Sequence, residues 1–83
     1  MMMKSIKIEL KLLEDIKSFV QCVNQYDLAI NLHAGRAYVN AKSILGIFSL
    51  DLSRPISVEV DENDSNIGKV QMLLKDLRKY RLQ

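Results

Sequence analysis

Hydrophobic and polar residues alternate one by one in three stretches of the chain, which is the period of a β-strand with one buried face. The apolar members of these stretches are Ile6, Ile8 and Leu10; Leu28, Ile30 and Leu32; and Ile56, Val58 and Val60. After the second stretch, Ala34-Gly35 can form a tight turn into a further strand over residues 37–41. The pattern predicts four strands, of which the middle two form a hairpin, preceded by a frayed start at residues 1–3.

Two longer stretches repeat apolar residues every three or four positions, which predicts helices that bury one side. Their apolar residues are Leu12, Leu13, Ile16, Phe19, Val20 and Val23 in the first, and Ile67, Val70, Leu73, Leu74 and Leu77 in the last. We expect Asp64 or Ser65 to cap the last helix, because both side chains can accept from free N–H groups. A short third helix is predicted after Ser43, which is placed as its N-cap.

The elements follow one another in the order β-α-β-β-α-β-α. The chain has 83 residues, so we expect a single domain over residues 1–83. Each predicted strand is polar at alternate positions, so the sheet needs cover on one face only. The sequence therefore predicts an α+β fold, a four-stranded antiparallel sheet with helices packed on one face as an open-faced sandwich.

The short helix is apolar on more than one side, at about 100° per residue. Its apolar residues fall into two groups: Ile47 and Leu50 on one side, and Ile44, Leu45 and Phe48 on another. A helix of under two turns cannot bury both groups in so small a protein. We therefore expect Ile44, Leu45 and Phe48 to be partly exposed beside the Ser43 hydroxyl and to bind another protein.

Charge and composition argue against several classes of function. Twelve basic and ten acidic residues give a net charge of +2. The basic excess lies near the C-terminus, at Lys69, Lys75, Arg78, Lys79 and Arg81. Cations there complement a helix dipole, so nucleic-acid binding is not expected. A single cysteine excludes an internal disulfide, and without an export signal or a membrane-spanning apolar run we expect a cytoplasmic protein.

No catalytic or metal-binding group emerges from the residue types. One histidine and one cysteine cannot form a transition-metal ligand set, and Cys22 has no base near it in sequence, so we interpret it as a semi-buried helical residue. The acidic run over residues 59–64 is interpreted as a solvated turn. Neither Gly35 nor Gly46 belongs to a phosphate-binding loop. We expect no enzyme activity, no metal and no cofactor.

The order of elements, the chain length and the segment Ala-Lys-Ser-Ile-Leu-Gly-Ile-Phe-Ser-Leu at residues 41–50 resemble HPr, the small phosphocarrier family of the bacterial sugar phosphotransferase system. The resemblance runs from about Lys4 onward. The serine segment is similar to that of low-GC Gram-positive HPr proteins, whose serine is phosphorylated by a dedicated ATP-dependent kinase. The resemblance implies that Ser43 is the matching serine. It also implies a docking surface made of Ile44, Leu45 and Phe48.

The chain departs from the family at the phosphocarrier histidine. The family places this histidine in a Leu-His-x-Arg-Pro motif that opens the first helix. Alignment on Phe19-Val20 puts Leu12 at the histidine, and Glu14 and Asp15 at the arginine and proline. Two carboxylates at a helix N-terminus occupy its positive end and repel a phosphate dianion. We therefore expect the carrier site to be lost.

The favoured interpretation is a regulatory, protein-binding relative that is switched by phosphorylation at Ser43. Its partner would be an HPr kinase, a transcription regulator or a second copy of the chain, as the histidine-less catabolite-repression HPr-like proteins suggest. One alternative is a constitutive interaction module without phosphate chemistry. The other is a phosphocarrier with a displaced acceptor, for which the only imidazole is His33, in the exposed phase of the second predicted strand.

Overall fold

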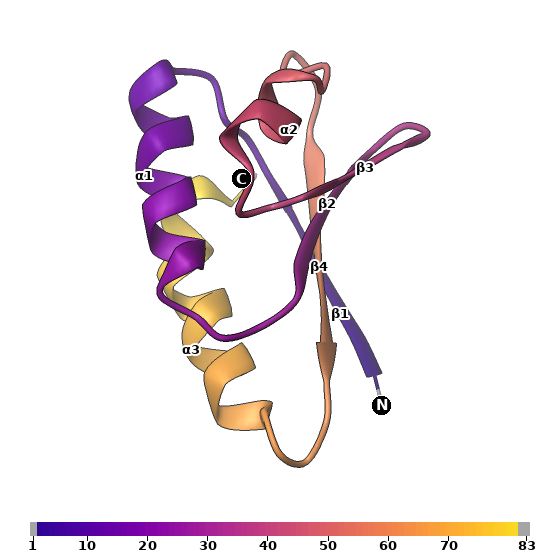
Figure 1. Cartoon of the computed structure of the whole chain (residues 1–83), viewed down its shortest axis with the longest axis vertical. Coiled ribbons are helices and arrows are strands. Elements are labelled where there is room, and N and C mark those ends of the chain that lie inside the picture. The colour runs from indigo at the N-terminus through magenta and orange to yellow at the C-terminus, as the bar shows by residue number, and fades with distance from the viewer. Residues whose placement is uncertain (1, 82–83) are drawn as a thin grey trace.

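The computed structural model describes residues 2–81 and contains the predicted elements in the predicted order (Figure 1). The strands are β1 (Met2–Ile8), β2 (Ile30–Ala34), β3 (Ala37–Asn40) and β4 (Ile56–Glu62). The helices are α1 (Leu13–Asn24), α2 (Ile44–Phe48) and α3 (Ile67–Asp76), and a 3₁₀ turn, η1 (Leu77–Tyr80), follows α3 directly. None of these helices is long and apolar enough to cross a membrane.

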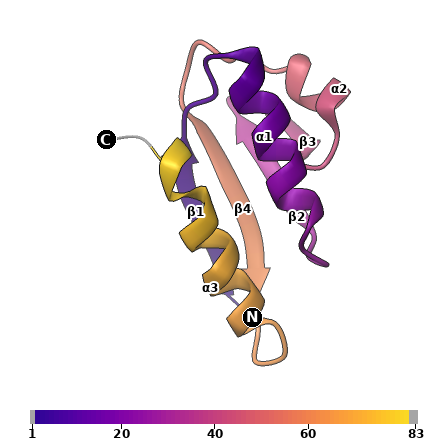
Figure 2. The ribbon, with the colours of Figure 1, turned by 90° about the vertical axis from the view of Figure 1, so that its left-hand side faces the viewer.

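The four strands form one antiparallel sheet in the order β1-β4-β2-β3, so β1 and β3 are its edges. Ile8 lies opposite Ile56, and Val58 lies between Ile6 on one side and Leu32 on the other. All three helices lie on the same side of the sheet (Figures 1 and 2). The predicted fold class, a four-stranded antiparallel sheet with helices on one face, is confirmed.

The core fills the layer between this sheet face and the helices. Its fully or nearly fully buried apolar residues include Ile8, Leu10, Ile16, Phe19, Val23, Leu28, Ile30, Leu32, Ala41, Ile47, Leu50, Ile56, Val58, Val60, Val70, Leu73, Leu77 and Tyr80. Phe19 of α1 meets Tyr80 of η1 edge to face, with ring centroids 5.7 Å apart. Such a pair adds about 0.5–1.5 kcal/mol to the burial of its rings, so the last turn of the chain is part of the core.

The first strand begins earlier than the sequence indicated. Met2 and Met3, which we expected to be frayed, pair with Glu62 and Asp61 of β4. The strand extends this far because β4 continues to Glu62 and offers its backbone as a partner. Met1 lies outside the described residues. Leu10, predicted to lie in this strand, is buried after its end, and Leu28 and Ala41 likewise flank β2 and β3 rather than belonging to them.

The first helix was predicted to be buried from its first residues, and this is wrong. Leu12 and Leu13, assigned to the apolar stripe, are 62% and 53% exposed. Leu12 is the N-cap residue and the buried side of α1 begins only at Ile16. The helical period continues back into the first turn, but that turn contributes nothing to the core.

The last helix starts later than predicted, with Asn66 rather than Asp64 or Ser65 at its N-cap. The turn before it is held by two asparagines. The Asn63 side chain accepts from the backbone N–H groups of Ser65 and Asn66 at 2.9 and 3.0 Å, and that of Asn66 accepts from the Asn63 N–H at 2.8 Å. These reciprocal bonds stabilise a turn through residues 64–66 and delay the helix.

Candidate docking and phosphorylation site

Ser43 caps α2 as the sequence predicted. Its backbone is extended, and its Oγ accepts a hydrogen bond from the Gly46 N–H at 3.1 Å. The Ser43 carbonyl accepts the first helical bond, from the Ile47 N–H, also at 3.1 Å. The hydroxyl therefore sits at the positive end of the helix, where added negative charge is favourable.

The cap depends on a glycine at position 46. A Cβ on Gly46 would stand 3.2 Å from Cβ of Val39 and 3.3 Å from Oγ of Ser43, both tighter than ordinary contact. Without a side chain, α2 can lie close against β3 and the serine oxygen can reach the helical N–H. The glycine inside this short helix thus serves the approach of its neighbours rather than a phosphate loop.

The two apolar sides of α2 differ in burial as expected. Ile47 is fully buried and Leu50 nearly so, whereas Leu45 is 80% and Phe48 48% exposed. Ile44 is partly buried and packs against the core, so it forms the margin of the exposed side. We refer to Ile44, Leu45 and Phe48 together as the α2 patch. Its exposure agrees with the sequence, whereas its role in binding stays a prediction.

The N-terminus of α1 lies beside α2 (Figures 1 and 2). The exposed Leu12 and Leu13 therefore belong to the same end of the molecule as the α2 patch. Sequence reasoning missed this because it assigned both leucines to the core. Leu12 and Leu13 stand at the N-cap and the first helical position, where side chains point back past the helix end and have no preceding turn to pack on; this position is the signal that could have revealed their exposure.

The N-terminus of α1 is already occupied by negative charge. Leu12 has no side-chain acceptor, and Asp15 takes over the capping role by accepting from the Leu12 N–H at 3.2 Å. Glu14 adds a second carboxylate to this first turn. The nearest preceding cation, Lys11, pairs with Glu9 at 3.0 Å. The positive end of the helix is thus neutralised by the chain itself.

His33 is less exposed than the sequence suggested. Its ring stacks on Tyr38 of the neighbouring strand, with centroids 4.2 Å apart and planes within 6°. Its Nδ1 lies 3.6 Å from a carboxylate oxygen of Glu59. Loss of hydration and, to a smaller extent, the Glu59 carboxylate raise the pKa of Tyr38. A phosphoryl group on the imidazole would meet a like charge at once, which disfavours His33 as a displaced acceptor.

Cys22 is a partly buried helical residue, as predicted. Burial raises the pKa of its thiol, and Asp76 raises it further against the opposing effect of Lys79. A raised pKa suppresses the thiolate, which is the nucleophilic form. Within residues 2–81, no group of three His, Cys, Asp or Glu side chains is arranged to hold a metal ion.

Comparison with known proteins identifies the relatives of this chain. The family model for the HPr component phosphorylation site of the phosphotransferase system matches residues 15–75, a range that includes Ser43 and α2 but not Leu12. No curated protein sequence matches the chain.

Solved structures give the same result. A phosphocarrier protein HPr from Bacillus anthracis is 27% identical, with a TM-score of 0.72, over 98% of this chain and 96% of the other. HPr-C-His from Thermoanaerobacter tengcongensis is 26% identical, with a TM-score of 0.71, over 95% and 92%. The histidine-containing phosphocarrier protein of a mycoplasma shares the fold at 18% identity and a TM-score of 0.60, over 90% and 93%.

Proposed function

Because the chain belongs to the HPr family of the phosphotransferase system, we propose that it is a regulatory, protein-binding member that does not carry a phosphoryl group on a histidine. In this proposal the α2 patch docks onto a partner protein, and phosphorylation of Ser43 switches the interaction. Proteins of this family are phosphocarriers rather than enzymes, and they act by contacting other proteins of the system.

The observation that carries the proposal is the acidic first turn of α1, with Glu14 and Asp15. An exposed Leu12 stands where the alignment expects the phosphorylated histidine, and the Asp15 carboxylate already binds its backbone N–H. A phosphate dianion about 4 Å from one carboxylate is repelled by about 2 kcal/mol even in bulk water, and by more at a protein surface. This end of α1 therefore opposes the chemistry of a carrier.

The geometry of Ser43 supports phosphorylation at that residue. A phosphoserine at an N-cap places close to two negative charges against the positive end of the helix, which favours the helix by about 0.3–1 kcal/mol at an exposed site. The N–H of Gly46, which now donates to the hydroxyl, would donate to a phosphate oxygen instead. We expect the fold to tolerate the modified residue.

The α2 patch supports docking beside this serine. Leu45 and Phe48 are exposed apolar side chains, and the exposed Leu12 and Leu13 at the start of α1 lie at the same end of the molecule. Aromatic residues at the centre of such surfaces often carry about 2 kcal/mol or more of binding energy. A phosphate on Ser43 would lie at the border of this surface, where it could attract a basic partner or repel an acidic one.

A kinase assay tests the switch. The purified chain is incubated with an HPr kinase and ATP, beside a Ser43→Ala variant and a matched Ser49→Ala variant. Ser49 caps the other end of α2 and donates its hydroxyl hydrogen to the Gly46 carbonyl at 2.5 Å. We expect wild type and Ser49→Ala to gain one phosphate and Ser43→Ala to gain none. Equal incorporation in all three, or none at all, would favour the constitutive interaction module.

A phosphotransfer assay tests the lost carrier site. With enzyme I and labelled phosphoenolpyruvate, an authentic HPr should become labelled and this chain should not. Acid-labile label on the wild-type chain that disappears in a His33→Ala variant would instead support a displaced acceptor.

A further inference from the structure

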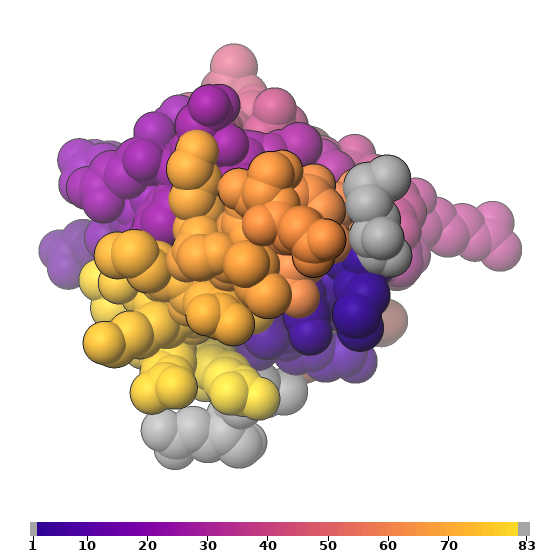
Figure 3. All heavy atoms as spheres, turned by 90° about the horizontal axis from the view of Figure 1, so that it is seen from below, coloured from indigo at the N-terminus to yellow at the C-terminus, as the bar shows by residue number. Residues whose placement is uncertain are grey.

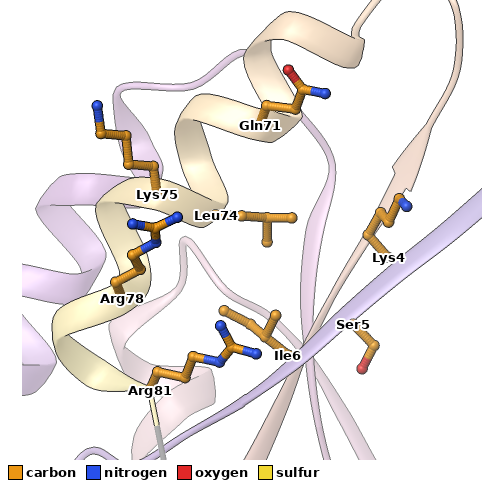
Figure 4. Close-up of a pocket in the computed structure, with 8 residues that line it drawn as sticks. All are labelled: Lys4, Ser5, Ile6, Gln71, Leu74, Lys75, Arg78 and Arg81. Carbon is orange, nitrogen blue, oxygen red and sulfur yellow. The ribbon is translucent and has the colours of Figure 1, made fainter.

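A second surface lies along β1, at the side of the sheet covered by α3. In the view from below, the atoms of β1 and of the C-terminal α3 and η1 lie next to one another (Figure 3). A hollow of about 450 Å³ opens between them. Its lining includes Lys4, Ser5, Ile6, Leu74, Arg78 and Arg81 (Figure 4). None of these residues belongs to the α2 patch.

The hollow has an apolar centre with cations around it. Ile6 and Leu74 face one another in the middle, with the guanidinium groups of Arg78 and Arg81 on one side and Lys4 on the other (Figure 4). Among residues 2–81, no ion pair involves either arginine, and Lys4 has only a long contact of 3.8 Å to Glu62. The two arginines are therefore available to an acidic ligand.

The helix dipole does not account for this arrangement. Arg81 follows η1 in an extended conformation and pairs with Ile8, so its position is set by the edge of the sheet. Lys4 comes from β1, at the other end of the sequence. Cations from two separate parts of the chain thus surround one apolar strip.

The backbone of β1 is open along this hollow. The strand pairs with β4 on one side only. At its end, the Glu9 N–H points to the other side and donates to the Tyr80 carbonyl at 2.8 Å. Backbone direction alternates along a strand, so Met3 and Ser5 direct their N–H and C=O groups to the same open side as Glu9. The C-terminal turn closes the edge at Glu9, whereas Met3 and Ser5 have no strand beside them among the described residues.

We propose that an extended acidic segment of a partner protein adds to β1 as a fifth strand. Its backbone bonds to Met3 and Ser5, and its carboxylates face Arg78 and Arg81. Charge selects this occupant over a second copy of the chain, because a second β1 would add its own two lysines, at positions 4 and 7, to the cations already beside this edge. The site is independent of Ser43 and of the α2 patch.

Solution NMR of the ¹⁵N-labelled full chain tests strand addition. The probe is a blocked peptide, Thr-Glu-Val-Glu-Val-Glu-Thr, with the same number of residues as β1. We expect it to shift the backbone signals of Met3, Ser5 and Arg78, and to slow exchange of the Met3 and Ser5 amides about tenfold or more. The same peptide with Gln in place of Glu should bind about tenfold more weakly, and added salt should reduce the difference.

Two variants separate charge from backbone pairing. The Arg78→Glu/Arg81→Glu variant should weaken peptide binding about tenfold or more, whereas Arg36→Glu/Arg54→Glu, with the same change of charge at exposed sites away from the hollow, should change it less than about twofold. Ser5→Pro removes an outward N–H while leaving the bonds to β4, a substitution that an edge strand tolerates. It should abolish the slowed exchange at Met3 with little change in melting temperature.

Several results would overturn the proposal. No binding at millimolar peptide would refute it, and so would equal binding of the Gln peptide. If inorganic phosphate alone shifts Arg78 and Arg81 to the same extent, and the peptide does not slow exchange at Met3 and Ser5, the hollow is a simple anion site. Shifts confined to the α2 patch would assign the peptide to the other surface.

Discussion

Three hydrophobic residues of α2, Leu45, Ile47 and Phe48, should contribute very unequally to stability. Ile47 is fully buried, Phe48 is about half exposed and Leu45 is mostly exposed. If the α2 patch exists for binding rather than for folding, truncating each side chain to alanine should cost stability in proportion to its burial. The loss of binding energy toward a partner protein should follow the opposite order.

The exposed fractions give the expected sizes. Full burial of a large apolar side chain stabilises a protein by about 1.5–3 kcal/mol. Leu45, at 80% exposure, should then lose only about 0.3–0.6 kcal/mol on truncation, and Phe48, at 48%, about 0.8–1.6 kcal/mol. Ile47→Ala removes buried methyl groups and leaves a cavity, so it should lose about 2–5 kcal/mol.

Urea and thermal denaturation of the three alanine variants measure these differences. In a domain of this size, 1 kcal/mol corresponds to about 4–8 °C in melting temperature, so Leu45→Ala should melt within about 5 °C of wild type and Ile47→Ala at least about 8 °C lower. If Ile47→Ala does not fold, Ile47→Val should still lose about 0.5–1.5 kcal/mol. A Leu45→Ala variant as unstable as Ile47→Ala would show that Leu45 is core, and the docking surface would be misplaced.

Three further predictions concern single groups. Ser43→Ala should destabilise the fold by about 1 kcal/mol in urea denaturation through loss of the helix cap, and Ser43→Asp should restore most of it because a carboxylate can accept the same bond. Desolvation and the hydrogen bond to Asp76 raise the pKa of Tyr26 from 10.0 to about 12, so ultraviolet titration should show a late tyrosinate step that Tyr26→Phe removes. The stability that this bond contributes should be complete below pH 10 and should decline as the pH rises toward about 12. Cys22 should react with iodoacetamide at neutral pH more slowly than free cysteine, because its raised pKa suppresses the thiolate; equal rates in a mass-spectrometric time course would contradict this.

The sequence was most informative where burial and period coincide. Ile56, Val58 and Val60 are all buried in β4, and the alternation that predicted them reflects the single covered face of the sheet. The cap at Ser43 was also predictable, because an N-cap depends on neighbours three residues away. Both features are local, and local patterns are visible in a single chain.

Features that depend on distant partners could not be predicted. Met2 and Met3 form a strand only because β4 continues to Glu62, sixty residues later in the chain. The hollow beside β1 is lined by both Lys4 and Arg81, from opposite ends of the sequence. Nothing in the local pattern of either segment indicates the other. Leu12 illustrates a different limit, since a helical period does not reveal where the covering layer ends.

The central position of β4 also determines when the chain can fold during its synthesis. Both β1 and β2 pair with β4, whereas the hairpin of β2 and β3 joins neighbours in sequence. A nascent chain on the ribosome can form that hairpin early, but β1 has no partner until residues 56–62 have emerged. Phe19 of α1 cannot form its edge-to-face contact until Tyr80 of η1 has also emerged. Folding should therefore be completed only once Tyr80 has left the ribosome, and a nascent chain stalled before residue 56 should expose its first strand to chaperones and proteases.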